Sequence, residues 1–298
     1  MKVIRTISEV RQEISRLRQS SGSGEATVGF VPTMGYLHEG HASLMRAAKE
    51  QSDIVVLSIF VNPIQFGPNE DFDSYPRDEA RDVETARLQG VDIVFIPSVS
   101  EMYPEPTQTT VSVSQLTDRL CGASRPGHFD GVTTVVSKLF NIVQPQRAFF
   151  GMKDAQQVAV IQQMVNDLNM AVEIVPCPIV RESDGLALSS RNVYLSGEQR
   201  EQALVLSQAL RVAQETIDTN PSVTAADIRE MLRKVIQASP LAVIDYSEIQ
   251  AFPSLQPLAD HEMVYGREDV LIALAVKFGK TRLIDNIKLH KSEVLSHV

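Results

Sequence analysis

Short apolar runs alternate with helical patterns over the first 180 residues of the chain. Apolar runs bounded by polar residues, glycine or proline predict buried strands at 28–31, 53–61, 91–97, 147–151 and 172–180. Apolar residues at helical spacing predict helices over 7–19, from His41 onwards, around 78–89, over 133–143 and over 155–166. Strands that alternate with helices form parallel sheets with right-handed crossovers, so we expect a parallel sheet here.

The pattern changes after about residue 180. A polar loop precedes two helical patterns and three strand-like runs, at 198–218, 224–237, 244–251, 270–276 and 281–289. Helices followed by adjacent strands are typical of an α+β arrangement. We therefore expect an α/β protein with a Rossmann-like parallel sheet flanked by helices over residues 1–180, and a smaller C-terminal α+β domain over 181–298. The composition of SSGSGE at 20–25 predicts a flexible linker.

Composition narrows the possible classes of function. The chain has 298 residues, enough for two domains, and a net charge of −9, which argues against a nucleic-acid surface. Its two cysteines offer neither a disulfide framework nor a Cys-x-x-Cys metal spacing, as suits a reducing cytosol. The first residues lack the apolar core of a signal peptide, and the run at 270–276 is too short to span a bilayer. We expect a cytoplasmic protein without membrane partners.

The segment ATVGFVPTMGYLHEGH, at 26–41, is typical of a strand, a glycine-bearing turn and a helix. His38 and His41 lie three residues apart where the turn meets the helix. Backbone N–H groups at a helix N-terminus attract anions, and two imidazoles would add donors for phosphate oxygens. A lone histidine in a turn is more often a surface or satisfied core residue, but the strand–turn–helix context favours a nucleotide-phosphate site.

Three further clusters carry candidate chemistry. Asn62 and Gln65 follow the predicted strand at 53–61, GMKDAQQ at 151–157 follows the strand at 147–151, and LSSR at 188–191 is a hydroxyl-rich turn with a guanidinium. Ligands bind beyond the carboxyl ends of parallel strands. We therefore expect the turns at 32–41, 62–67 and 151–157 to converge.

Each cluster, taken alone, also has an interpretation that involves no function. Lys153-Asp154 could be an ordinary helix N-terminus, and Asn62-Pro63 could be turn chemistry. Residues 189–191 could form a solvated loop, and His128 in RPGHFDGV could be incidental.

Taken together, the motifs resemble the pantothenate synthetase (pantoate–β-alanine ligase) family, within the nucleotidyltransferases that share a His-x-Gly-His motif. PTMGYLHEGH, FVNPIQF, YPR, RPGHFDGV, GMKDAQQ and SSRN occur in family order and nearly family spacing. Leu188 stands where the family usually has Met, an exchange that keeps volume and apolarity.

The resemblance implies a two-step ligase. The pantoate carboxylate would attack the α-phosphorus of ATP to give pantoyl adenylate and pyrophosphate. The amine of β-alanine would then attack the acyl carbon, releasing AMP and pantothenate. Magnesium would bridge the phosphates, with Asp82 as a possible outer ligand. The family also implies a homodimer.

The resemblance further implies roles for individual residues. His38, His41, Lys153 and Arg191 would be catalytic, stabilising charge on the phosphates, and His41 would be the proton donor. The residues implied in ATP binding are Met34, Gly35, Tyr36, Leu37, His38, Glu39, Gly40, His41, Gly151, Met152, Lys153, Asp154, Val180, Leu188, Ser189, Ser190 and Arg191. Those implied in binding pantoate or β-alanine are Asn62, Gln65, His128 and Gln157.

Three other functions stay open at this point. A nucleotidyltransferase that joins a phosphate ester to a nucleotide would call for more Arg or Lys than the glutamine pair Gln65 and Gln157 supplies. A metalloprotein would use His38, His41 and His128 as zinc ligands, although no Cys or His-Glu-x-x-His helix accompanies them. A non-catalytic nucleotide-binding module would bind ATP without releasing pyrophosphate.

Overall fold

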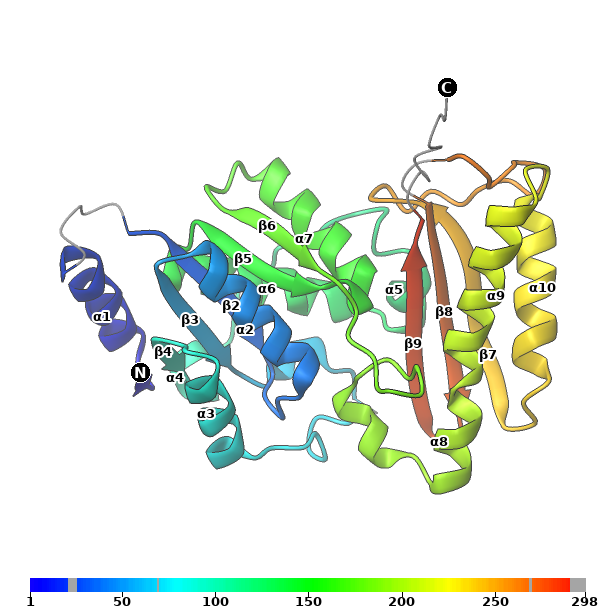
Figure 1. The fold of residues 1–298 in the computed structure, drawn as a ribbon. Helices are drawn as coiled ribbons and strands as arrows, with labels where there is room; N and C mark the ends of the chain where they lie inside the picture. The colour runs from blue at the N-terminus through cyan, green and yellow to red at the C-terminus, as the bar shows by residue number, and fades with distance from the viewer. Residues whose placement is uncertain (21–25, 69, 268–269, 290–298) are drawn as a thin grey trace. The chain divides into compact units, whose positions relative to one another are not determined.

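The structure is a computed structural model that describes residues 1–20, 26–68, 70–267 and 270–289. The chain divides into two compact units (Figure 1). The first unit comprises Met1–Met152 and Val160–Val180, and the second comprises Lys153–Ala159 and Arg181–Val298. Residues 21–25 of the predicted linker lie outside the described residues. No described helix combines the length and the apolarity needed to cross a membrane.

The first unit is built on a six-stranded parallel sheet with the order β1-β4-β3-β2-β5-β6. Its strands are β1 (Lys2–Ile4), β2 (Val28–Thr33), β3 (Ile54–Ile59), β4 (Ile93–Phe95), β5 (Arg147–Gly151) and β6 (Glu173–Cys177). Its helices are α1 (Ile7–Ser20), α2 (Glu39–Gln51), α3 (Glu79–Leu88), α4 (Val99–Met102), α5 (Leu120–Ser124), α6 (His128–Val143) and the 3-10 turn η1 (Pro63–Gln65). The predicted parallel sheet flanked by helices is confirmed.

Helices cover both faces of this sheet. Val31 of β2 packs in a buried cluster with Leu44 and Met45 of α2. The preceding residue, Phe30, meets Phe140 of α6 edge-on, with ring centroids 6.4 Å apart. Because side chains alternate along a strand, β2 buries one row of residues against α2 and the other against α6. This two-sided burial explains the near-continuous apolar runs of the sequence.

The strand order reverses its direction beside β2. From β2 the chain passes to β3 on one side, whereas β5 lies on the other side of β2. Open parallel sheets bind ligands at such a switch point, beyond the carboxyl ends of the strands. The turn at 34–38 follows β2, and Gly151-Met152 ends β5. The fold therefore places the turn at 34–38 and the first two residues of the 151–157 segment at the switch point.

The second unit contains a three-stranded antiparallel sheet with the order β7-β8-β9. Two of its helices, α9 and α10, pack on this sheet and bury a common apolar core (Figure 1). Two elements span the division between the two units: η2 (Met152–Asp154) and α7 (Ala155–Asp167). The other elements of the second unit are η3 (Ser190–Tyr194), α8 (Gly197–Ala203), α9 (Val205–Thr219), α10 (Ala225–Gln237), β7 (Ala242–Ala251), β8 (Val270–Phe278) and β9 (Thr281–Lys288). The predicted small α+β arrangement is confirmed.

Several boundaries differ from the predictions. Helix α2 begins at Glu39 rather than at His41, because His38 caps it. Helix α6 begins at His128, five residues earlier than its apolar periodicity suggests, behind Gly127 in a left-handed conformation. The predicted helix at 198–218 is two helices that meet at Leu204. The short elements β1, α4 and α5 were not predicted, because a few residues carry no readable period.

Candidate active site

The turn that carries the histidines is held by a buried carboxylate. Asp82 of α3 is 1% exposed, and its two oxygens accept the backbone N–H groups of Tyr36, at 2.8 Å, and Leu37, at 2.6 Å. Burial raises the pKa of Asp82, and the two backbone hydrogen bonds oppose this shift. Gly35 has φ +84°, and a Cβ there would lie 2.9 Å from both Asp82 Oδ2 and Ile59 Cγ2. The turn therefore requires glycine at position 35 and is held by contacts within the protein.

His38 and His41 form a reciprocal cap on the first turn of α2. His38 Nδ1 accepts from the backbone N–H of Gly40 at 3.2 Å, and His41 Nδ1 accepts from the backbone N–H of His38 at 3.3 Å. The ring centroids lie 4.1 Å apart. Because each Nδ1 accepts a hydrogen bond, the neutral form of each ring carries its proton on Nε2. The capping arrangement therefore makes Nε2 of both histidines a hydrogen-bond donor.

The side chain of Gln65 is oriented by a buried hydrogen-bond network. Asn62, which is 1% exposed, donates through Nδ2 to the Gly131 carbonyl at 3.1 Å and to Gln65 Oε1 at 3.2 Å. Its Oδ1 accepts from the Tyr103 hydroxyl at 2.8 Å. Burial raises the pKa of Tyr103 to about 12, so this hydroxyl keeps its proton at neutral pH. A carbonyl can only accept, so the Gly131 bond fixes both amides and makes Gln65 Nε2 the donor.

The contacts of Gln65 bring two predicted turns together. Gln65 Nε2 lies 2.9 Å from the sulfur of Met34, so the turns at 32–41 and 62–67 converge as predicted. Gly131 allows α6 to approach closely, since a Cβ there would lie 2.5 Å from Gln65 Cα. These contacts join three of the motifs that the sequence singled out.

His128 supports Gln65 from the other side. Its Nδ1 donates to the Gln65 carbonyl at 2.8 Å, and its Nε2 accepts from Arg125 at 2.9 Å. Arg125 in turn makes two hydrogen bonds, each of 2.6 Å, to the carboxylate of Glu70. Both ring nitrogens of His128 thus contact protein groups. A direct contact between His128 and substrate stays a prediction.

Other predicted residues of the first unit lie at strand ends or on helix surfaces. Gly151 ends β5, and a Cβ there would meet no described atom within 4 Å, so the space beside it is open. Met152 follows it directly, and Val180 follows β6. Glu39, at the first position of α2, pairs with Arg46.

The second unit brings two distant predicted segments together. Lys153 and Ser189 line the same small cavity, of about 10 Å³, together with Asn192 and Asp285. Ser189 caps η3 by accepting the backbone N–H of Arg191 at 3.3 Å. The other predicted residues of this unit are Asp154, which is exposed, Ser190, which is buried, and Gln157 and Leu188, which are half-buried.

The loop ahead of Ser189 is fastened by charged side chains. Arg181 makes two hydrogen bonds to the carboxylate of Asp285, at 2.6 and 2.9 Å, and a third to the Gly185 carbonyl at 3.1 Å. Arg200 of α8 reaches the carboxylates of Glu182 and Asp184. Together these contacts fold residues 181–187 into a compact turn closed by hydrogen bonds between Glu182 and Leu186 and between Gly185 and Glu182.

Sequence reasoning missed Arg181, Asp285, Asn286, Tyr103 and Arg125. A signal existed for Asp285: it stands between Leu283 and Ile287, where strand alternation predicts an apolar residue. A charged residue at such a position indicates a partner. Tyr103 and Arg125 lie in irregular segments whose sequence offers no comparable signal.

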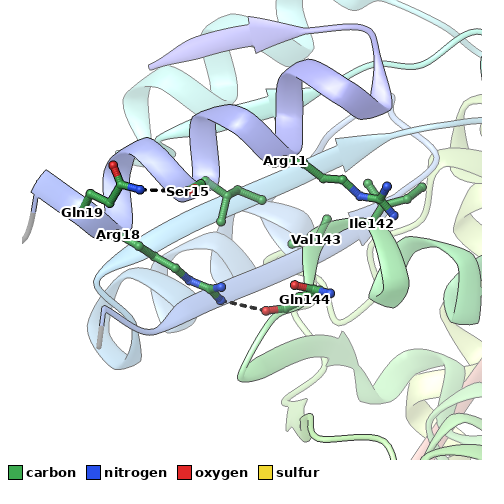
Figure 2. A pocket seen from close by; sticks show the side chains of 8 residues that line it. Arg11, Ser15, Arg18, Gln19, Ile142, Val143 and Gln144 are labelled. Atoms are coloured by element: carbon green, nitrogen blue, oxygen red, sulfur yellow. Dashed lines mark hydrogen bonds between the residues drawn. The ribbon is translucent and has the colours of Figure 1, made fainter. Parts of the chain in front are cut away.

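A separate hollow lies between α1 and the C-terminal end of α6 (Figure 2). Its volume is about 570 Å³, and it is lined by residues that include Arg11, Arg18 and Gln144. Arg18 donates to the Gln144 carbonyl at 2.9 Å, and Arg11 donates to the Asn141 carbonyl at 3.2 Å. Cations that contact the last carbonyls of a helix stabilise its end, which accounts for both charges here.

Within the described ranges, no three His, Cys, Asp or Glu side chains are grouped so that they could hold a metal ion. Nδ1 of His38 and of His41 accepts a backbone hydrogen bond, and both nitrogens of His128 contact Gln65 and Arg125. Both oxygens of Asp82 accept backbone N–H groups, so an outer-shell role of this carboxylate stays a prediction.

A parallel sheet with a histidine-capped turn at its switch point places the chain in the class of α/β proteins that bind ligands beyond the carboxyl ends of their strands. The sequence model described as Pantoate-beta-alanine ligase matches residues 2–288. The chain belongs to the pantoate–β-alanine ligase family, which confirms the resemblance carried by the motifs.

Individual relatives cover nearly the whole chain. A pantothenate synthetase of Caldicellulosiruptor saccharolyticus is 55% identical over 287 residues, which cover 96% of this chain and 99% of the relative. One of Pelotomaculum thermopropionicum is 57% identical over 286 residues, covering 96% and 98%.

Two solved structures have the same fold. Pantothenate synthetase from Thermus thermophilus has a TM-score of 0.89 at 45% identity and covers 97% of this chain and 100% of its own. Pantoate-beta-alanine ligase from Francisella tularensis, complexed with beta-gamma ATP and beta-alanine, has a TM-score of 0.75 at 33% identity, with 97% of each chain covered.

Proposed function

We propose that the protein condenses pantoate with β-alanine in two steps, the first of which consumes ATP. In the first, a pantoate carboxylate oxygen bonds to the α-phosphorus of ATP, and the bond to pyrophosphate breaks. In the second, the amine of β-alanine bonds to the acyl carbon of pantoyl adenylate, AMP leaves with the bonding electron pair, and the amine loses a proton. Family membership supports the overall condensation, and the Francisella tularensis relative was solved with an ATP compound and beta-alanine.

The observation that carries this proposal is the histidine pair at the switch point. Each Nδ1 is engaged by a backbone N–H group, which leaves each Nε2 as the donor in the neutral ring. Two such donors at a helix N-terminus suit phosphate oxygens that gain charge during attack on the α-phosphorus. His41 would also donate a proton to the leaving pyrophosphate.

Gln65 suits the acid substrate. Its amide presents N–H donors rather than its oxygen, because Asn62 occupies Oε1. A neutral donor can bind a carboxylate or hydroxyl oxygen without neutralising the attacking carboxylate, as a cation would. We assign the same role to Gln157, which lies in the first turns of α7.

In the second unit, Lys153, Ser189, Ser190 and Arg191 would hold the phosphates of ATP. Lys153 and Ser189 line the same small cavity, so the GMKD and LSSR segments lie close together. The remaining residues of the GMKD and LSSR motifs, with Val180, would contact the nucleotide. We also propose that the first unit binds nucleotide and pantoate and that the second closes over the ATP site.

Magnesium would enter with ATP rather than occupy a protein cage. The described residues offer no group of three ligands for it, and Mg²⁺ in nucleotide sites is commonly held by phosphates and water. When bound, it would neutralise phosphate charge. The chain's own part would be to orient the phosphates through Lys153 and the two histidines.

Pyrophosphate release from ATP and pantoate, measured with and without β-alanine, tests this function. We expect pantoate-dependent pyrophosphate, and then AMP and pantothenate once β-alanine is added. Activity with a phosphate ester in place of pantoate would favour a nucleotidyltransferase of the same superfamily. ATP binding without pyrophosphate release from either acceptor would indicate a binding module.

Two further properties carry over from the sequence as proposals. We propose a homodimer, which light scattering of the purified protein would test, with a mass of one chain contradicting it. We also propose a cytoplasmic location, which fractionation of the source cells would test.

A further inference from the structure

The final described strand of the second unit contacts both of its predicted phosphate-binding segments. Strand β9 lies at the edge of the sheet and, among the described strands, pairs with β8 alone. Its adjacent residues Asp285 and Asn286 are 2% and 5% exposed, which is unusual for polar residues on an edge strand. Buried polar groups on a strand indicate specific partners.

The partners of these two residues lie far away in the sequence. Asp285 binds Arg181, 104 residues earlier, and so fixes the loop that leads to Ser189. Asn286 donates through Nδ2 to the backbone carbonyl of Lys153 at 2.9 Å, 133 residues earlier. Successive side chains of a strand point to opposite faces, so one strand contacts the two segments from its two sides.

The backbone N–H of Asn286 tightens this arrangement by donating to Asp285 Oδ1 at 2.8 Å. The cavity lined by Lys153, Ser189 and Asp285 shows that the segments meet around β9. A shift of the Lys153 backbone would move its ammonium group relative to Ser189. The Asn286 amide opposes such a shift, because the shift would break its hydrogen bond to the half-buried Lys153.

We infer that Asn286 is a positioning residue for Lys153, acting from the strand that also fixes the loop ahead of Ser189. The inference rests on the proposed function, in which Lys153 pairs with ATP phosphates. Asn286 would touch no substrate and would act through the backbone of Lys153.

The test compares Asn286→Ala with Asn141→Ala in the full-length protein. Asn141 also donates to a backbone carbonyl, that of Ser137 at 2.9 Å, but within α6. We expect Asn286→Ala to weaken ATP use roughly 3–10-fold, the size of one lost hydrogen bond, in KM and in the thermal-shift Kd. The KM values for pantoate and β-alanine should stay unchanged, and Asn141→Ala should leave all three constants unchanged.

A double-mutant cycle separates positioning from a general structural effect. In a Lys153→Ala background, Asn286→Ala should no longer weaken the thermal-shift Kd for ATP, because its effect passes through Lys153. An equal loss in that background, an equal loss for all three substrates, or unchanged ATP constants would overturn the inference. If Asn286→Ala does not fold, Asn286→Leu repeats the test with the same branched side-chain skeleton, a larger volume and no donor.

The same measurements distinguish this inference from the proposed function. A wild-type protein that releases no pyrophosphate with pantoate contradicts the function itself. An active wild type whose Asn286 variants bind ATP normally contradicts only the inference.

Discussion

The two units hold their candidate site residues by different means. In the first unit, main-chain groups make the decisive contacts: backbone N–H groups bind Asp82 and the two histidines, and the Gly131 carbonyl orients Asn62. In the second unit, the Arg181–Asp285 ion pair joins the loop to β9 through two side chains, and the Asn286 side chain donates to the Lys153 backbone carbonyl. A contact with a main-chain group depends on one side chain, whereas the Arg181–Asp285 ion pair is lost when either of two side chains is changed.

We expect the removal of a histidine from the first unit to lower the reaction rate without changing the fold. His41→Ala should keep its fold but slow pantoate-dependent pyrophosphate release by about 10²–10³, the usual effect of one transition-state donor. Circular dichroism and single-turnover kinetics would measure both properties. The exposed His261→Ala is the matched control. Near-normal turnover of His41→Ala would remove His41 from the mechanism.

Substitution of two glycines of the first unit should affect stability in one case and ligand binding in the other. Gly131→Ala should lower the free energy of unfolding by about 1–3 kcal/mol, because its Cβ would overlap the backbone of Gln65. Gly151→Ala should leave stability unchanged, since its Cβ enters open space, yet raise the KM for ATP if nucleotide approaches there. Urea unfolding and initial-rate kinetics measure the pair. Equal stability losses in both variants would contradict this difference.

In the second unit, the Arg181–Asp285 ion pair should contribute more to stability than an ion pair between exposed side chains. Arg181→Gln should lower the free energy of unfolding by roughly 1–3 kcal/mol, because it leaves the buried Asp285 carboxylate without its cation. The partial exposure of Arg181 keeps the effect within this range. Arg211→Gln removes an exposed pair with Glu215 and should change stability by less than about 0.5 kcal/mol. Denaturant titration of both variants tests this. A similar small change in each would show that the loop does not depend on Asp285.

The smallest expected effect concerns Tyr103. Tyr103→Phe removes the donor to Asn62 Oδ1 and should lower the free energy of unfolding by about 1–2 kcal/mol. This is the lower part of the range for a buried acceptor that is left without a donor. The loosened Gln65 should raise the KM for pantoate and leave that for ATP unchanged. Initial rates with each substrate varied would show this split. Tyr265→Phe, at an exposed position, serves as the control, and an equal rise in both KM values would contradict the assigned network.

Sequence patterns predicted the sheet and the motifs because both are local. Apolar runs of β2, β3 and β5 stand out from their flanking turns, and each motif follows one of them. The three-residue β1 was missed, since it is too short to show a period. The start of α2 was misplaced because Gly40 interrupts the helical pattern, whereas the structure uses His38 and His41 as a reciprocal cap.

The contacts that hold the site could not be predicted in the same way. Asp82 meets Leu37 across 45 residues, Asn62 meets Gly131 across 69, and Lys153 meets Asn286 across 133. Local propensity and periodicity carry no information about which distant residues pair. Only the polar Asp285 in an otherwise apolar row hinted at such a partner.

The separation of Arg181 and Asp285 in the sequence has a consequence for the order in which the chain folds during its synthesis. A ribosome adds Asp285 of β9 104 residues after it has added Arg181 of the loop. During that interval the loop's guanidinium has no carboxylate from β9, and the Lys153 carbonyl has no amide donor from it. The loop at 181–187 and the Lys153 segment therefore reach their final arrangement only after β9 emerges, long after the histidine turn of the first unit has been synthesised.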